Sequence, residues 1–504
     1  MLVSAEVDNG LPIYEDTVPL QPGQRIAHDR VVKRIGTVFA LIAVCGCADH
    51  QPPPRPNVVV IVVDTLRADR LPFYGSPHNT APFLTDLARR SLVFESAWSP
   101  SSWTLPATVS AVTSVHPFQH GVNNLDGLEL GPGDKAVPVN YIPEELETLA
   151  EVMGAAGYRT YGIVSNVLVG PEIGFERGFD RFFRLEDKDA DRVNALVRTF
   201  QEEMLNNGPF FLYLHYFDPH DPFHAREPWF DLESSTSAAG WPEEISVGPD
   251  ISEDLGWIMT RLEPGPEEFE GRNAEDLSPD EIHRLLAWIK AAYDSEIGFV
   301  DSRIREVFEM LDLDDAVVVF YSDHGEEFYE HGDLTHGQNL YAETVRVPFL
   351  LYLPQDGAPR GRVEEHVSTL DILPTLRGLL RLPPSNQDQG QDLLGDAPRR
   401  PVLGILEGKS GQHPLEDDLR SIVAGAHRLI GTRDGEVELY DIVRDPLERN
   451  DIADAFPDVV TELLHALDRV ERSVPKYPRA RRLPERPNEA LRKHLQGLGY
   501  LGNK

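Results

Sequence analysis

Cysteine is almost absent from this chain. Among its 504 residues only Cys45 and Cys47 are cysteines, and both lie near the N-terminus. A disulfide-stabilised body, a cysteine nucleophile and a cysteine-ligated zinc site are therefore excluded from Ala48 onwards.

Basic residues are also scarce. The chain has 47 Lys and Arg against 83 Asp and Glu, which gives a formal net charge of -36. This balance argues against nucleic acid as a partner, since binding its phosphates requires basic patches. It also argues against a broad electrostatic attraction to anionic lipid. An anionic substrate would have to be held locally, by a metal ion or a few placed donors.

Long hydrophobic runs are missing too. The apolar run at 35–44 follows Lys33 and Arg34 and is too short for a membrane-spanning helix, but it suits the core of a signal peptide. The sequence Val-Cys-Gly-Cys at 44–47 resembles a bacterial lipobox. We therefore expect an exported lipoprotein of the bacterial envelope, periplasmic or associated with the outer membrane, that contacts the membrane only through a lipid anchor. An ordinary cleaved signal or a buried apolar strand are the alternatives.

The rest of the chain alternates between strand and helix patterns, which predicts an α/β fold with a largely parallel central sheet and helices on both faces. A small C-terminal α+β subdomain is expected to follow. Strands are expected at 57–63, 158–164, 209–217, 315–321 and 347–353, with helices near 81–90, from 106, and at 145–156, 191–205 and 278–310. In the C-terminal part, strands are expected at 402–406, 421–424 and 437–440, and a helix at 457–474.

These patterns divide the chain into successive segments. The predicted parts are a disordered or mis-assigned start at 1–29, a signal and lipobox at 30–47, a Pro-rich tether at 48–56, a catalytic domain at 57–380 with an acidic insertion at about 224–277, a C-terminal subdomain at 381–475 and a tail at 476–504. The insertion shows neither helical nor strand periodicity and is a candidate lid over the site.

Polar residues follow three of the predicted strands. Asp64, the segment 215–220 and the pair Asp323-His324 each come near a strand end. Ligands of open parallel sheets bind beyond the carboxyl ends of the strands, so these groups should converge. Two carboxylates and an imidazole suit Mn²⁺, Zn²⁺ or Mg²⁺. Thr104, in a loop that enters a helix, is the candidate fourth ligand and nucleophile, although such a threonine is more often an N-cap.

At this point the sequence resembles the sulfatase family of the alkaline-phosphatase superfamily. The matching segments are Asn57–Asp64 with Thr65-Leu66-Arg67-Ala68-Asp69, Thr104-Leu105-Pro106-Ala107-Thr108, Ser322-Asp323-His324-Gly325-Glu326-Glu327, Glu330-His331-Gly332, Val345-Arg346-Val347-Pro348, Leu439-Tyr440-Asp441 and Asp445-Pro446. Together they cover about residues 56–474. The resemblance implies an alkaline-phosphatase-like fold and a metal-dependent ester hydrolase.

The departures from the family pattern concern the site itself. Thr104 replaces the Cys or Ser that sulfatases convert to formylglycine, so no formylglycine is expected. Thr108 replaces an Arg of the same motif, and Thr65 replaces an Asp. Val164-Ser165-Asn166 stands where many sulfatases have Gly-Lys-Trp-His. The cationic clamp and the usual calcium ligand set are therefore incomplete, which favours Mn, Zn or Mg, with Ca kept as an alternative.

With these departures, the site residues resemble those of the threonine-nucleophile branch of the superfamily. That resemblance implies one divalent metal ion held by Asp64, Thr104, Asp323 and His324. Thr104 would attack the phosphorus or sulfur. The substrate-binding candidates are His220 and His336, which would stabilise the oxyanion or protonate the leaving group, together with His215 and Asn166.

The sequence thus predicts a hydrolase of sulfate, phosphate or phosphonate esters that are small molecules, glycans or lipids, with no nucleic-acid partner. Two alternatives stay open. One is a transferase that moves phosphoglycerol or phosphoethanolamine onto envelope glycans or lipids. The other is a catalytically inactive, sulfatase-like binding protein on the cell surface.

Overall fold

The computed structural model describes residues 55–123, 139–185, 189–232 and 255–482, apart from short gaps at 257, 261, 263–264, 270, 355–357, 408, 411–412, 415–417, 475–476 and 479. The predicted start, the signal and lipobox and most of the tether lie outside these residues. So do the middle of the acidic insertion and most of the tail. Within the part of the chain that is described, none of the helices combines the length and apolarity needed to cross a lipid bilayer.

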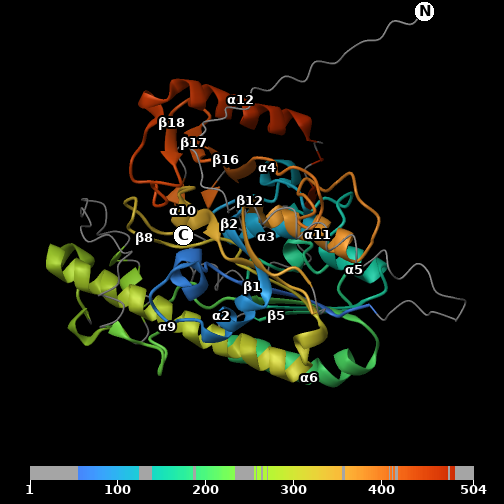
Figure 1. Ribbon diagram of the computed structural model, residues 1–504. Coiled ribbons are helices and arrows are strands. Elements are labelled where there is room, and N and C mark those ends of the chain that lie inside the picture. Colours follow the sequence, from blue (N-terminus) through green and yellow to red (C-terminus); the bar gives the residue numbers. More distant parts are fainter. Residues whose placement is uncertain are drawn as a thin grey trace, which may run out of the picture. The chain divides into compact units, whose positions relative to one another are not determined.

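A nine-stranded sheet forms the centre of the fold (Figure 1). Its strands are β1 (Val58–Val63), β2 (Ser91–Trp98), β4 (Arg159–Val164), β5 (Arg181–Arg184), β6 (Phe210–Tyr216), β7 (Val317–Tyr321), β10 (Arg346–Val347), β11 (Phe349–Tyr352) and β12 (Gly361–Ser368). The order is β10-β2-β11-β7-β1-β6-β4-β5, and β12 pairs with β2. The five strands from β7 to β5 are parallel, whereas β11 is antiparallel to both its neighbours. The predicted α/β fold with a largely parallel sheet is confirmed.

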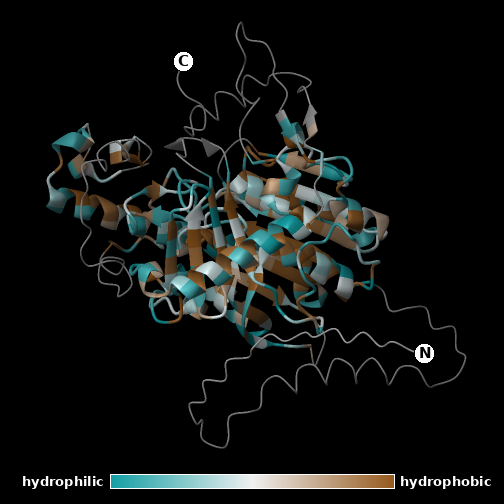
Figure 2. Cartoon of the chain, turned by 90° about the horizontal axis from the view of Figure 1, so that it is seen from above, coloured by the Kyte–Doolittle hydropathy of each residue, from teal (hydrophilic) through white to brown (hydrophobic). Residues whose placement is uncertain are grey.

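Strand β1 shows why the sequence folds this way. All six of its residues are Val or Ile and all are buried, as expected for a strand covered on both faces. Val58, Val60 and Val62 face one hydrophobic cluster, and the alternate residues face the other. Figure 2 shows hydrophobic residues concentrated along the strands.

Helices cover both faces of the sheet. Helices α3 (Thr104–Thr113), α5 (Leu149–Ala155) and α11 (Ile372–Leu379) pack on one face, and α2 (Pro82–Arg89), α6 (Ala190–Asn206) and α9 (Pro279–Leu311) pack on the other. Helix α9 begins where the sequence predicted, because Ser278 and Glu281 form a capping box. The short helices are α4 (Pro117–His120) and α10 (Ala342–Val345).

The C-terminal part is built on a separate antiparallel sheet. Its strands, in spatial order, are β13 (Val402–Leu406), β16 (Leu419–Ala424), β17 (His427–Thr432) and β18 (Val437–Asp441), and α12 (Pro457–Ser473) packs against them. The strands and the helix predicted here are confirmed, while β17 was missed. The exact domain boundaries stay predictions.

Three two-stranded pairs complete the described fold. They are β3 (Val139–Tyr141) with β19 (Ala480–Arg482), β8 (Glu327–Phe328) with β9 (Leu334–Thr335), and β14 (Lys409–Ser410) with β15 (His413–Pro414). The β8–β9 pair follows the Asp323-His324 segment directly, so it helps to fix the loop that carries the predicted metal ligands.

Candidate active site

Three neighbouring strands bring two carboxylates and a histidine together. Asp64 follows β1 and Asp323 follows β7, while His215 belongs to β6 and lies beside Val62 of β1. All three side chains are fully buried. The Nε2 of His215 lies 3.3 Å from Oδ2 of Asp64 and 3.9 Å from Oδ2 of Asp323. His215 is the second-last residue of β6, within the range 209–217 predicted for this strand.

Two turns that carry these carboxylates are tied to each other. The N–H of Leu66 donates to Oγ of Ser322 over 2.9 Å, and the Ser322 hydroxyl donates to the carbonyl of His324 over 2.6 Å. Thr65 adopts a positive φ of 53°, and its carbonyl accepts a hydrogen bond from the Tyr293 hydroxyl. This bonding holds the segment after β1 against the segment after β7, which fixes the spacing between Asp64 and Asp323.

His324 presents a nitrogen lone pair to the same place. Its Nδ1 lies 2.9 Å from the carbonyl of Gly325, which only accepts, so Nδ1 carries the proton. Nε2 is therefore an acceptor, 3.5 Å from Oδ1 of Asp64 and 3.6 Å from Oδ2 of Asp323. Burial and the nearby His336 hold the pKa of His324 well below its usual value. A neutral imidazole anchored through its other nitrogen is the usual form of a metal ligand.

Thr104 is the first residue of α3, and Trp103 is the N-cap. The threonine side chain therefore does not cap the helix, which was the alternative that the sequence left open. Its hydroxyl lies 3.2 Å from Nε2 of His324 and accepts from Nδ2 of Asn166 over 3.4 Å. The side chain is completely buried. Helix α3 thus carries the hydroxyl to the edge of the carboxylate and histidine cluster.

Asn166, just after β4, connects the threonine to the carboxylates. Its Oδ1 accepts from the N–H of Leu168 over 2.8 Å, which fixes the orientation of the amide. Nδ2 then donates to Oδ2 of Asp64 over 2.5 Å as well as to Thr104. Asn166 is a neutral residue that orients both a carboxylate and the hydroxyl.

His336 lies beside His324, and His220 lies beside His336. The ring centroids of His336 and His324 are 4.5 Å apart, and those of His220 and His336 are 4.8 Å apart. Nδ1 of His220 lies 2.8 Å from the carbonyl of Asp221. Burial opposes the charged form of His220, but the charge of Asp221 outweighs it and raises the pKa to about 9. All eight residues predicted for the site are therefore brought together.

The cluster is suited to a cation. Within the described residues, Oδ1 of Asp64, Oδ2 of Asp323 and both ring nitrogens of His215 have no hydrogen-bond partner. Unpaired buried polar atoms are costly, and burial together with the charge of Asp64 raises the pKa of Asp323 well above its usual value. The candidate ligand atoms of Asp64, His215 and Asp323 all lie within 4.8 Å of one another. A divalent ion would satisfy these atoms.

Glu326 was not predicted from the sequence as a residue of the site. Glu326 is fully buried, and its Oε1 lies 2.9 Å from Nδ1 of His336. Burial raises the pKa of this carboxyl well above its usual value. One sequence signal could have indicated Glu326, namely its place two residues after His324 in the matching segment.

Comparisons with known proteins identify the family of the chain. The sequence model of the sulfatase family matches residues 56–382. The chain is 25% identical to an ulvan-active sulfatase of Formosa agariphila, over 79% of this chain and 77% of the relative. It is 26% identical to the N-sulphoglucosamine sulphohydrolase of Homo sapiens, over 78% of this chain and 75% of the relative.

The fold also has close structural counterparts. The phosphonate monoester hydrolase of Agrobacterium radiobacter superposes with a TM-score of 0.64 at 19% identity, covering 83% of this chain and 96% of that one. At this identity the likeness shows the shared fold. Together with the family match over residues 56–382, it supports one conclusion: the chain belongs to the sulfatase family of the alkaline-phosphatase-like superfamily, and it is a hydrolase of sulfuric or phosphoric esters.

Proposed function

We propose that this enzyme cleaves sulfate or phosphonate-type esters with Thr104 as its nucleophile and one divalent metal ion as its cofactor. The observation that carries the proposal is the position of the Thr104 hydroxyl, 3.2 Å from Nε2 of His324, beside two buried carboxylates with unpaired oxygens. A threonine buried at a helix start has no structural need for such surroundings.

The proposed ligands of the metal are Asp64, Thr104, Asp323 and His324, with His215 as a further nitrogen ligand. A bound divalent ion would lower the pKa of the Thr104 hydroxyl and neutralise charge on the ester oxygens. The hydrogen bond from Asn166 to Thr104 orients the hydroxyl oxygen, and its bond to Asp64 orients that carboxylate.

The proposed reaction proceeds in two displacements. The Thr104 oxygen, having lost its proton to solvent, attacks phosphorus or sulfur, and the bond to the leaving oxygen breaks. His220 or His336 donates a proton to that oxygen, so the alcohol leaves neutral. The same histidine then takes a proton from water as the water oxygen bonds to phosphorus or sulfur and the bond to Thr104 breaks; the Thr104 oxygen regains a proton from solvent.

The charge of the site favours esters with a single negative charge. By the family resemblance, Thr108 stands in place of a clamp Arg and Val164-Ser165-Asn166 in place of Gly-Lys-Trp-His, and none of these residues is cationic. Sulfate monoesters, phosphodiesters and phosphonate monoesters each carry one negative charge. Phosphate monoesters carry nearly two at neutral pH and would gain less from this site. We therefore propose monoanionic esters as the substrate class.

The test is an ester panel with matched threonine variants. The purified chain is assayed with aryl sulfate, aryl phosphonate, phosphodiester and phosphate monoester substrates, each with Mn²⁺, Zn²⁺, Mg²⁺ or Ca²⁺. Thr104→Ala should reduce kcat by more than about 1,000-fold, because it removes the nucleophile. Thr113→Ala removes a hydroxyl from the same helix that only bonds the carbonyl of Val109, and it should retain wild-type turnover.

The same panel distinguishes the other interpretations. Turnover that is unaffected by Thr104→Ala would show that another group is the nucleophile. Turnover that depends on an added glycan or lipid alcohol would favour the transferase. A chain that binds no metal and turns over no ester would be a binding protein.

We further propose that the enzyme is exported and anchored through lipid on Cys47. This proposal rests on the apolar run at 35–44 and the lipobox-like residues before Cys47, which lie outside the described residues. Radiolabelled palmitate should be incorporated into the wild type and the Cys45→Ser control but not into Cys47→Ser. Equal labelling of all three proteins would contradict the proposal.

A further inference from the structure

Thr108 carries a buried hydroxyl one turn along α3 from the proposed nucleophile. The residue is 1% exposed, and its Oγ1 has no hydrogen-bond partner among the described residues. Four threonines of other helical turns donate this hydroxyl to the carbonyl four residues earlier, over 2.7 to 2.9 Å; they are Thr85, Thr113, Thr199 and Thr461. Thr108 does not make this bond to the carbonyl of Thr104. Leaving a buried hydroxyl without a partner is costly, so its orientation calls for another explanation.

Helix geometry places the Thr108 side chain over the first turn of α3. Residues four apart lie on the same face of a helix, with Cβ atoms about 5–6 Å apart, and each Cβ is tilted toward the N-terminus. The Thr108 side chain therefore covers the turn that begins at Thr104. A sulfate or phosphonate group bonded to Thr104 has oxygens that extend beyond the Thr104 oxygen, and one hydrogen bond of about 2.7 Å spans the remaining distance to Thr108.

The first turn of α3 also offers backbone donors. Trp103 is the N-cap, and its side chain makes no capping hydrogen bond. The N–H of Ala107 donates to the carbonyl of Trp103 over 3.3 Å, so the N–H groups of Thr104 and Leu105 lie ahead of the first bond within the helix. Such N–H groups, with the helix dipole behind them, favour an anion at this end of α3.

The residues around this turn supply neutral donors only. Ser102, just before the N-cap, is fully buried, and its Oγ has no hydrogen-bond partner among the described residues. The segment 99–115 contains no charged residue. An anionic group at the start of α3 would therefore be bound by hydroxyl and N–H groups of this segment, without a cation from it.

We propose that the Thr108 hydroxyl binds a non-bridging oxygen of the sulfate or phosphonate group that reacts at Thr104, together with the N–H groups of the first turn of α3. Hydrogen bonds to a charged oxygen are stronger than those between neutral groups. Neutral donors offset the lost hydration of one negative charge more fully than that of two, so Thr108 contributes to the selection of monoanionic esters. The inference rests on the proposed function and names the residue that holds the transferred group.

The test compares variants that exchange a hydroxyl for a methyl group at two positions of the same helix. Thr108→Val removes the hydroxyl without a partner, whereas Thr113→Val removes one that bonds the carbonyl of Val109. Thr108→Ser keeps the hydroxyl and is the conservative variant. Each change is made in the full chain, and the metal ion that supports turnover is supplied at the same concentration throughout.

The first measurement is the affinity for benzenesulfonate, a monoanion that has no leaving oxygen and is not turned over. In calorimetric titrations Thr108→Val should raise the Kd about 10- to 100-fold, because it loses a hydrogen bond to a charged oxygen. Thr113→Val and Thr108→Ser should bind within about threefold of the wild type. For aryl sulfates, kcat/KM of Thr108→Val should fall by at least the factor by which the Kd rises.

The second measurement separates binding from folding. In the free protein the Thr108 hydroxyl is buried without a partner among the described residues, so exchanging it for a methyl group should leave the urea midpoint unchanged or raise it. Thr113→Val gives the baseline for the same exchange elsewhere on α3. A variant that binds the anion more weakly and yet is as stable as the wild type has lost a ligand contact and not a structural one.

Several outcomes would overturn the inference. They are wild-type affinity of Thr108→Val for benzenesulfonate, an equal loss of affinity in Thr113→Val, a lower urea midpoint in Thr108→Val together with wild-type affinity, and no binding of benzenesulfonate by the wild type. All of them leave the proposed nucleophile intact as long as Thr104→Ala is inactive. An active Thr104→Ala would overturn the proposed function instead, while the affinity for benzenesulfonate would still report on Thr108.

Discussion

Two clusters in this protein contain the same kinds of side chain but differ in how their polar atoms are hydrogen-bonded. Asp64, His215 and Asp323 form one, and Glu327, His331 and Glu343 form the other. In each cluster, one candidate ligand atom from each of two carboxylates and an imidazole lies within 4.8 Å of the others. The first has atoms without hydrogen-bond partners among the described residues, namely Oδ1 of Asp64, Oδ2 of Asp323 and the nitrogens of His215.

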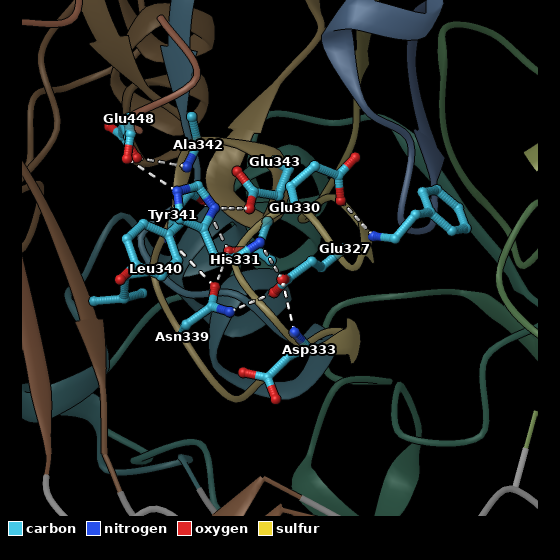
Figure 3. Close-up of polar contacts among 12 residues, drawn as sticks. Glu327, Glu330, His331, Asp333, Asn339, Leu340, Tyr341, Ala342, Glu343 and Glu448 are labelled. Carbon is cyan, nitrogen blue, oxygen red and sulfur yellow. Dashed lines mark hydrogen bonds and ion pairs between the residues drawn. The ribbon is translucent and has the colours of Figure 1, made fainter. Parts of the chain in front are cut away.

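The second cluster satisfies its own atoms with N–H donors. Oε1 of Glu327 accepts from the N–H groups of His331 and Asp333 over 2.8 Å and 3.0 Å, and Oε2 accepts from Nδ2 of Asn339 over 2.5 Å (Figure 3). Nε2 of His331 lies 2.9 Å from the carbonyl of Glu448. Both ring nitrogens of His331 therefore have oxygen partners, since Nδ1 contacts Glu343. A metal ion would have to break bonds that already exist here.

The comparison shows that proximity of ligand-type residues does not define a metal site. What distinguishes the first cluster is that several of its ligand atoms have no hydrogen-bond partner among the described residues, whereas N–H groups occupy both Glu327 oxygens of the second. The second cluster instead connects the loop after β7 to the C-terminal part of the chain, because Glu448 also pairs with Arg428 of β17. We assign it a structural role.

The largest expected effect is a difference in metal content between variants of the first cluster and a variant of the second. His215→Ala and Asp323→Asn should each lower metal affinity by more than about 100-fold, because losing even an outer-shell partner of a ligand costs 10–100-fold. Glu327→Gln, which changes the second cluster, should keep about one ion per chain. Elemental analysis after dialysis measures the difference. Equal metal loss in Glu327→Gln would make the second cluster a metal site and remove the contrast.

Much of this arrangement could be predicted from local sequence. The β-branched run at Val58–Val63 predicted β1, and the capping box at Ser278 predicted the start of α9. The positions of Asp64 and Asp323 after buried strands predicted that their carboxylates converge. These predictions succeeded because each depends on periodicity or capping within about one element.

Other features depend on contacts between distant residues. Strand β2 was missed because Ser91, Glu95 and Ser96 interrupt its apolar pattern, although all but Glu95 of its residues are buried. The place of Thr104 beside His324 spans 220 residues of sequence; its position where a loop enters a helix made it a candidate, and the family resemblance supported that choice. The pairing of Glu326 with His336 had no sequence signal of its own, since an adjacent glutamate, Glu327, belongs to the structural cluster.

A smaller effect on activity, but a large one on stability, is expected from Arg428→Met. Arg428 and Glu448 are both fully buried and their closest N···O distance is 2.6 Å. Removing the guanidinium leaves the Glu448 carboxylate buried without its partner, which should lower the free energy of unfolding by about 3–5 kcal/mol. Urea denaturation measures this loss. Metal content and kcat of the folded variant should stay at wild-type values, and loss of the metal ion would show that the two clusters are not independent.

The smallest expected effect is the pH dependence of stability that His331 of the second cluster contributes. Burial opposes the charge on His331, but its contact with Glu343 raises the pKa of His331 to about 9. Below about pH 6.5, the usual histidine pKa, the folded and unfolded chains both hold this proton and the stabilisation is complete. As the pH rises from about 6.5 to 9 the unfolded chain gives up the proton first, so up to about 3 kcal/mol of stability is lost. Urea denaturation at both pH values should show a steeper decline for the wild type than for His331→Gln. Parallel declines would mean that His331 and Glu343 share no proton. The charge of the carboxylates in this region would then be balanced by Arg67, which forms an ion pair with the nearby Glu330.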